Sequence, residues 1–272
     1  MDKRNLDIDD TNVSLDLSDA TQAVKENRFK DATTLLNRIL KDQSENIDAL
    51  YLLSVSYRYL KEFDKSERHI MNLLSIAPDM GRAYQELGHL NRDQGNEEKA
   101  VMHYRQACEL NPALLASWNF LYQYFVKYSN KPAADHAKEQ LEKLKSLPGL
   151  LLYITQILNE GRLGLAEEKC RAFLKKNPTH TYAMSLLAEI ANRLGYFDDA
   201  EFLLEKAVEF SPEDGDLRTK YAEILRKKQK FSKTMEQVEI LCEKFPDNLS
   251  YQAQKASEIM QNGDHKQAIT LL

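Results

Sequence analysis

A phrase of 34 residues recurs along this 272-residue chain, and the recurrence limits the possible folds more than any other feature. The aligned copies begin at Val13, Ile47, Gly81, Leu115, Leu147, Thr181, Gly215 and Leu249. Seven copies are complete, the eighth is truncated, and the step from Leu115 to Leu147 is 32 residues. Self-similarity at a fixed period of this length is the sequence signature of a repeat architecture.

Four positions within the copies predict their local structure. Small side chains at positions 8 and 20 allow two antiparallel helices to approach closely: Ala20, Ser54, Gly88, Ala188, Ala222 and Ala256, and Ala32, Ser66, Ala100, Ala134, Ala166, Ala200, Thr234 and Ala268. Position 15 often holds a residue that tolerates the left-handed conformation at a helix end: Asn27, Gly95, Gly161, Gly195 and Gly263. Position 32 holds prolines that stop a helix: Pro78, Pro112, Pro178, Pro212 and Pro246. Each copy therefore predicts a helix, a tight turn, a second helix and a stop.

This pattern resembles the tetratricopeptide repeat. The third copy, GRAYQELGHLNRDQGNEEKAVMHYRQACELNPAL, carries Tyr84, Leu87, Gly88, Ala100, Tyr104, Ala107 and Pro112 where the family pattern places them. The resemblance implies an all-α superhelical solenoid of about seven and a half helix-turn-helix units, irregular at the fourth unit. It also implies a concave groove that binds a segment of another protein.

The domain organisation follows from the alignment. We expect a polar N-terminal tail over residues 1–12, four repeats over 13–146, and repeats five to eight over 147–272, the last truncated, in one continuous solenoid.

The fourth copy departs from the pattern, because its first helix is rich in aromatic residues. These residues are Trp118, Phe120, Tyr122, Tyr124, Phe125 and Tyr128. One interpretation is that they repack an irregular junction, and the other is that they form an apolar docking patch. Exposure of Phe120 and Tyr124 would favour the docking patch.

Composition excludes several classes of function. The net charge of −5 gives the molecule no basic footprint for nucleic acid. No apolar run approaches the length of a membrane span. Cys108, Cys170 and Cys242 are more than 60 residues apart and form no CxxC motif, which argues against a disulfide framework or a zinc site and favours a reducing, cytoplasmic compartment.

We find no motif for a catalytic, metal or cofactor site in these residues. The sequence contains no HExxH, GxSxG or GxxxxGK[ST] motif, and the six histidines lack metal-ligand spacing. We therefore expect no catalytic residues, metal or cofactor in this part of the protein. The oligomeric state is not indicated.

In the family that the repeats resemble, positions 2, 5, 9, 12 and 13 of each first helix line the groove. The candidate partner-binding residues are Tyr51, Arg58, Tyr59, Gln85, His89, Arg92, Asn119, Gln123, Lys127, Tyr182, Glu189, Arg193, Glu223, Arg226 and Lys227. Six of the seven complete copies place a cation at position 12 or 13. These cations can complement the helix dipole, or they can form a ladder for an acidic partner segment.

A more specific resemblance begins at Ile154. The phrases EGRLGLAE, LLAEIANRLGYFDDAEFLLEKAVEFSPE and RKKQKFSKTMEQVE look like the region that precedes the catalytic domain in bacterial tetratricopeptide–sulfotransferase fusions. This resemblance implies that the chain is the non-catalytic N-terminal part of an enzyme that uses 3′-phosphoadenosine 5′-phosphosulfate. Two alternatives remain open, which are a stand-alone adaptor and the repeat arm of a glycosyltransferase of the O-linked N-acetylglucosamine transferase family.

Overall fold

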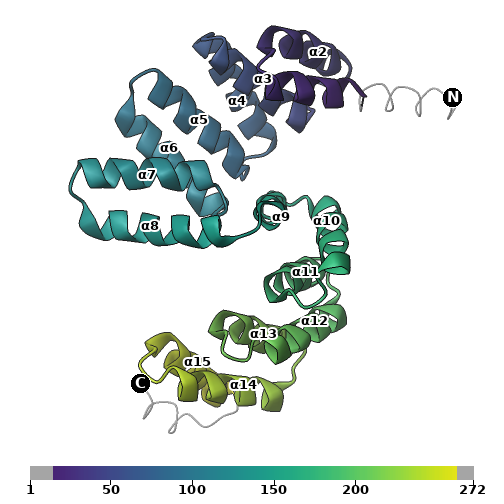
Figure 1. Ribbon diagram of the computed structural model, residues 1–272, viewed down its shortest axis with the longest axis vertical. Helices are drawn as coiled ribbons and strands as arrows, with labels where there is room; N and C mark the ends of the chain where they lie inside the picture. Colours follow the sequence, from purple (N-terminus) through teal and green to yellow (C-terminus); the bar gives the residue numbers. More distant parts are fainter. Residues whose placement is uncertain (1–14, 262–272) are drawn as a thin grey trace, which may run out of the picture. The chain divides into compact units, whose positions relative to one another are not determined.

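The computed structural model describes residues 15–261, and these residues form α-helices joined by short links, with no strand among them (Figure 1). Residues 15–25 are helical, and the polar tail predicted over residues 1–12 lies outside the described residues. The helices that follow are α2 (Phe29–Asp42), α3 (Ile47–Tyr59), α4 (Phe63–Ile76), α5 (Gly81–Asp93), α6 (Glu97–Leu110), α7 (Leu115–Lys127), α8 (Lys131–Ser146), α9 (Gly149–Asn159), α10 (Leu163–Lys176), α11 (Thr181–Arg193), α12 (Phe197–Phe210), α13 (Gly215–Lys227), α14 (Phe231–Lys244) and α15 (Leu249–Gln261). The predicted all-α fold class is confirmed.

The helix boundaries follow the 34-residue period. The helices α3, α5, α7, α11, α13 and α15 each begin at the first residue of an aligned copy and contain 13 residues. The second helices α4, α6, α10, α12 and α14 each end two residues before the proline at position 32. Polar side chains close several first turns, as where Asn46 and Asp214 accept hydrogen bonds from backbone N–H groups of α3 and α13. The predicted helix-turn-helix unit is confirmed.

The turn at position 15 has the left-handed conformation in all seven complete copies. Gly95, Gly161 and Gly195 have φ of 80°, 76° and 82°. The other four copies use residues with a β-carbon, Asn27, Lys61, Ser129 and Gln229, with φ between 55° and 61°. The residue at position 15 of the eighth copy, Gly263, lies outside the described residues.

The small residues at positions 8 and 20 lie where the two helices of a repeat meet. All described members of position 20 are buried, as are those of position 8 except Tyr122. At Gly88 an added β-carbon would lie 2.7 Å from the ring of the fully buried Tyr104, so only glycine fits without a shift. Ala268 lies outside the described residues.

Substituting leucine for Ala100 or Ala200 should overpack a pair of helices. Both alanines are fully buried, so we expect each variant to lose about 1–3 kcal/mol of unfolding free energy. Ala116→Leu is the matched control, because Ala116 is exposed on α7 and its replacement should cost less than about 0.5 kcal/mol. Chemical denaturation measures all three, and equal stabilities would mean that the helix register is wrong.

The chain divides into two compact units, Met1–Leu152 and Tyr153–Leu272, with the division inside α9. Each unit has its own buried clusters, for example Leu50, Ile70 and Leu73 in the N-terminal unit and Leu204, Tyr221 and Leu225 in the C-terminal unit. The continuous solenoid across residues 146 and 147 stays a prediction.

The irregular fourth repeat has an identifiable cause. Its position 32 is Ser146 instead of proline, and α8 runs for 16 residues to that serine, whereas the other second helices have 14. Pro148 then separates α8 from the shorter α9, which has 11 residues. The absence of the usual stop signal thus accounts for the longer helix.

The aromatic residues of α7 mostly pack inward. Phe120 and Tyr124 are half-buried, and the Phe120 ring lies 4.4 Å from the buried Tyr104 ring, centroid to centroid. Phe125 is buried, whereas Tyr128 at the end of α7 is 54% exposed. This arrangement favours the repacking interpretation over a docking patch.

Candidate functional site

The candidate site is the first-helix face, which we define as positions 2, 5, 9, 12 and 13 of the first helices of the repeats. In the N-terminal unit it is carried by α3, α5 and α7, and consecutive members of this set lie against each other. In the C-terminal unit it is carried by α11, α13 and α15. We describe the two units separately.

Arg58 is a structural residue between two repeats. Its guanidinium is 6% exposed and donates to Glu86 at 2.5 Å and to Asp93 at 2.9 Å. Glu86 is 2% exposed, and burial raises its pKa while Arg58 opposes that rise. Arg58 therefore ties α3 to α5, and we leave it out of the partner-binding surface.

His89 is bonded to the core beneath it. Its Nδ1 lies 2.6 Å from the hydroxyl of Tyr104, and the two rings meet edge to face. Burial lowers the pKa of His89 to about 4, with smaller contributions from Arg58 and Arg92. The imidazole is therefore neutral at pH 7.

Tyrosines and amides make up much of the rest of this face in the N-terminal unit. Tyr51 lies under the guanidinium of Arg82 at 4.8 Å, and the exposed Tyr59 stacks on Phe29 at 4.5 Å. The amide of Gln85 donates to Ser117 at 3.0 Å. Asn119 and Gln123 are exposed on α7.

Two exposed cations complete the N-terminal part. Arg92 is 45% exposed and pairs with its neighbour Asp93 at 2.8 Å. Lys127 is 57% exposed and pairs with Glu97 of the preceding repeat at 2.7 Å. Both cations already have internal carboxylates, which an acidic partner would have to displace.

In the C-terminal unit, Tyr182, Glu189 and Arg193 are held by local contacts. The hydroxyl of Tyr182 lies 3.1 Å from that of Thr155. Arg193 pairs with Glu189 at 2.8 Å and donates to the carbonyl oxygen of Leu158 at 3.0 Å, which joins α11 to α9.

The next repeat contributes one half-buried cation and two exposed charges. Arg226 pairs with Glu258, which is only 2% exposed, so this cation has a structural role like that of Arg58. Lys227 is exposed, donates to Asn192 at 2.8 Å and lies 6.0 Å from the Phe197 ring. Glu223 is exposed on α13.

The sequence analysis missed a charged cluster beside this face. Lys228 is paired with Asp198 and Glu201, and Lys230 with Glu201 at 2.6 Å. Burial acts to raise the pKa of Glu201, but the two lysines lower it overall. The 34-residue period was the available signal, because it places position 14 of one repeat near position 21 of the preceding repeat.

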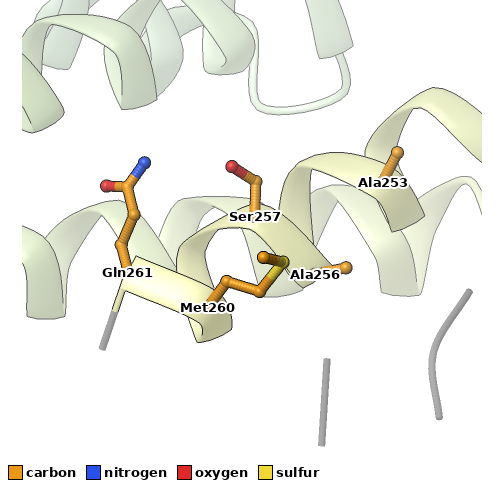
Figure 2. Close-up of a pocket in the computed structure, with 5 residues that line it drawn as sticks. All are labelled: Ala253, Ala256, Ser257, Met260 and Gln261. Atoms are coloured by element: carbon orange, nitrogen blue, oxygen red, sulfur yellow. The ribbon is translucent and has the colours of Figure 1, made fainter. Parts of the chain in front are cut away.

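A shallow apolar pocket of ≈ 460 Å³ lies on α15, lined by Ala253, Ala256, Ser257, Met260 and Gln261 (Figure 2). Positions 5, 9 and 12 contact the next first helix in earlier repeats, as Arg58 and Gln85 do. The pocket therefore lies on the part of α15 that corresponds to a contact between repeats.

The described residues offer little for metal or thiol chemistry. Within residues 15–261, no three His, Cys, Asp or Glu side chains lie close enough to hold a metal ion. All three cysteines are free thiols, and burial raises the pKa of Cys108 to about 12 and that of Cys170 to about 11. A helix long and apolar enough to cross a bilayer is not found in this part of the chain.

Family models match the repeats that the period marks out. A tetratricopeptide repeat model matches residues 47–80 and 81–114, and a second tetratricopeptide repeat model matches residues 158–215. The first two matches begin where two aligned copies begin. These segments of the chain are tetratricopeptide repeats.

The chain is also similar to longer proteins. The DnaJ homolog subfamily C member 7 homolog of Dictyostelium discoideum is 23% identical over 231 residues, which cover 80% of this chain and 38% of that protein. A structure of Naa15/Naa10 bound to HypK-THB has 15% identity and a TM-score of 0.44, covering 91% of this chain and 39% of that chain. The thermophilic TPR protein TTC0263 of Thermus thermophilus has 19% identity and a TM-score of 0.35, covering 91% and 99%. The chain spans about two-fifths of the length of the curated relative that it matches.

Proposed function

We propose that this chain is a protein-interaction scaffold that binds a segment of a partner along the first-helix face. The tetratricopeptide repeats support this role. One observation carries it further: the regular stacking of the first helices leaves Asn119, Gln123, Lys127, Glu223 and Lys227 exposed at positions 5, 9 and 13 of α7 and α13. Such a row of polar side chains on a rigid support can bind an extended or helical segment.

Photo-crosslinking tests this location. A photoreactive amino acid would replace Gln123 or Glu223 on the first-helix face, and Lys99 or Glu236 on second helices as matched controls; all four side chains are exposed. We expect a discrete crosslinked partner from the first pair in the protein's own host. The same partner crosslinked equally from the controls would contradict binding along the first helices.

An acidic partner segment is the finer proposal. Only Arg92, Lys127, Arg193 and Lys227 among the position 12 and 13 cations discussed above are at least 38% exposed or classed as exposed. Replacing these four by glutamine should weaken binding of the crosslinked partner and flatten its salt dependence, because fewer charges would be screened. Arg226 is unsuitable for this test, because removing it would leave the buried Glu258 without its cation.

Affinity of the purified partner, measured at two salt concentrations, reads out the quadruple variant. The control is a variant that loses charge on second helices instead, Lys99→Gln with Lys233→Gln, at exposed positions. Equal binding by both variants would remove the acidic partner and leave the scaffold proposal in place.

Fusion to a sulfotransferase is a second, more specific proposal, supported by the resemblance of residues 154–248 to the repeat region of such enzymes. In this arrangement the repeats would hold the acceptor protein near the enzyme and raise its effective concentration. We expect residues 1–272 alone to give no heat of binding with 3′-phosphoadenosine 5′-phosphate in calorimetry, and the natural full-length product to bind it. A full-length product that does not bind this nucleotide would contradict the fusion. A reducing, cytoplasmic compartment is proposed on the same footing, supported by the free thiols.

A further inference from the structure

A cavity of ≈ 470 Å³ lies between α6, α7 and α8 of the N-terminal unit. Cys108, Leu121 and Phe125 form its buried floor. Leu121 and Phe125 stand at positions 7 and 11 of their repeat, about 100° or more around α7 from Asn119 and Gln123. The cavity is therefore separate from the first-helix face, and its role does not depend on the proposed function.

Small side chains on α8 account for this cavity. Ala133, Ala134 and Ala137 face α7 and belong to, or pack against, the same buried cluster as Phe125. At position 24, where α6 places the large buried Tyr104, α8 has the exposed Lys138. The side chains of α8 thus leave space that a well-packed helix pair would fill.

One wall of the cavity is fixed by hydrogen bonding. The indole Nε1–H of Trp118 donates to the carbonyl oxygen of Pro112 at 2.8 Å. The ring of His136 meets the Trp118 ring edge to face at 5.5 Å. A half-buried indole held in this way gives a preformed aromatic wall, as in many ligand sites.

The rim has a positive end and a negative end. The guanidinium of Arg105 lies 5.2 Å from the centroid of the Phe125 ring, and within residues 15–261 it forms no ion pair. Glu109 lies one turn along α6 towards Pro112, where Trp118 is bonded. The exposed Arg105 is thus available to pair with a carboxylate at the Phe125 end of the cavity.

We propose that this cavity binds a bulky apolar side chain of a partner segment, with a carboxylate of that segment paired to Arg105. The apolar floor and the Trp118 wall would hold the side chain. Arg105 and Glu109 would set the direction of the segment along α6, with its acidic end at Phe125.

Two small probes with one apolar body and opposite charge test this site directly. They are 4-phenylbutanoate and 4-phenylbutylamine, and the readout is the indole N–H resonance of Trp118, the one tryptophan of the chain. We expect a saturable shift with the carboxylate, and binding that is tighter than that of the amine by up to about fivefold, as an exposed ion pair gives. Arg105→Gln should remove this preference, and Lys99→Gln, on the same helix outside the cavity, should keep it.

A variant that fills the cavity provides the second arm. Ala133→Leu places a larger side chain at the half-buried wall and should reduce binding of both probes at least about fivefold, since the apolar body loses its space. Absence of a saturable shift with either probe in the unmodified protein would overturn the site. Equal affinity for the two probes, or a preference that Arg105→Gln leaves intact, would overturn the assignment to an acidic segment.

Discussion

Replacing Arg58 with methionine should destabilise the protein by about 3–5 kcal/mol at pH 7.5, the cost typical of breaking a buried ion pair by removing one partner. The variant leaves the carboxylate of Glu86, only 2% exposed, without its cation. Removing both charges with Arg58→Met and Glu86→Leu should recover most of the loss, because neither charge then remains buried. Urea denaturation of the single and double variants measures this difference.

The loss in the single variant should depend on pH in a defined direction. Burial raises the pKa of Glu86, and without Arg58 nothing in the pair opposes the rise. The folded variant then holds its proton to higher pH than the unfolded chain does, so its stability falls as pH rises through that interval. The defect should be larger at pH 7.5 than at pH 5. Lys127→Met, which breaks an exposed pair, should have little effect, and an equal loss in both variants would contradict the buried pair.

Acidification should weaken the fold through His89. The pKa of this imidazole is about 4 in the folded protein, against an ordinary value of 6.5. Below pH 6.5 the unfolded chain takes up a proton that the folded chain does not, so this contribution is complete above pH 6.5 and is lost progressively as pH falls towards 4. At ~1.4 kcal/mol per pH unit, the interval corresponds to about 3 kcal/mol.

Comparison with His89→Gln isolates this contribution from that of the carboxylates. Glutamine keeps an oxygen that can accept the hydrogen bond from Tyr104 but does not titrate. The difference in unfolding free energy between the two proteins should change by about 3 kcal/mol from pH 7 to pH 4, in favour of the variant at low pH. A difference that stays constant over this range would mean that His89 is not protected from protonation.

Much of the fold could be predicted from the sequence, because the repeat period carries the information. Ile47, Gly81 and Thr181 begin helices as the alignment predicted, since the stop signals and small residues recur at fixed offsets. The left-handed turns at Lys61 and Gln229 were not marked, because neither residue type favours that conformation and only the spacing indicates it.

The candidate site was less predictable. A cation at position 12 reads the same in the sequence whether it is exposed or buried, yet Arg58 is paired across repeats and Arg92 is exposed. The difference depends on a carboxylate 28 residues further along the chain, Glu86, whose packing the sequence does not give. The cavity beside Trp118 also could not be foreseen, because it results from the combined volumes of side chains on three helices.

The central claim is that a single 34-residue register runs through the chain and decides which residues face a partner. Glycine substitutions at position 15 test it most directly, because the sign of the effect depends on the register. Lys61→Gly, Ser129→Gly and Gln229→Gly should each raise the unfolding free energy by about 0.5–1 kcal/mol, since relief of the left-handed conformation (~1–2 kcal/mol) exceeds the added entropy of the unfolded chain (~0.4–1 kcal/mol). Lys99→Gly, within α6, should lower it by about 1 kcal/mol. Stabilisation by the first three and destabilisation by the last is the result that the register predicts, and destabilisation by all four would contradict it.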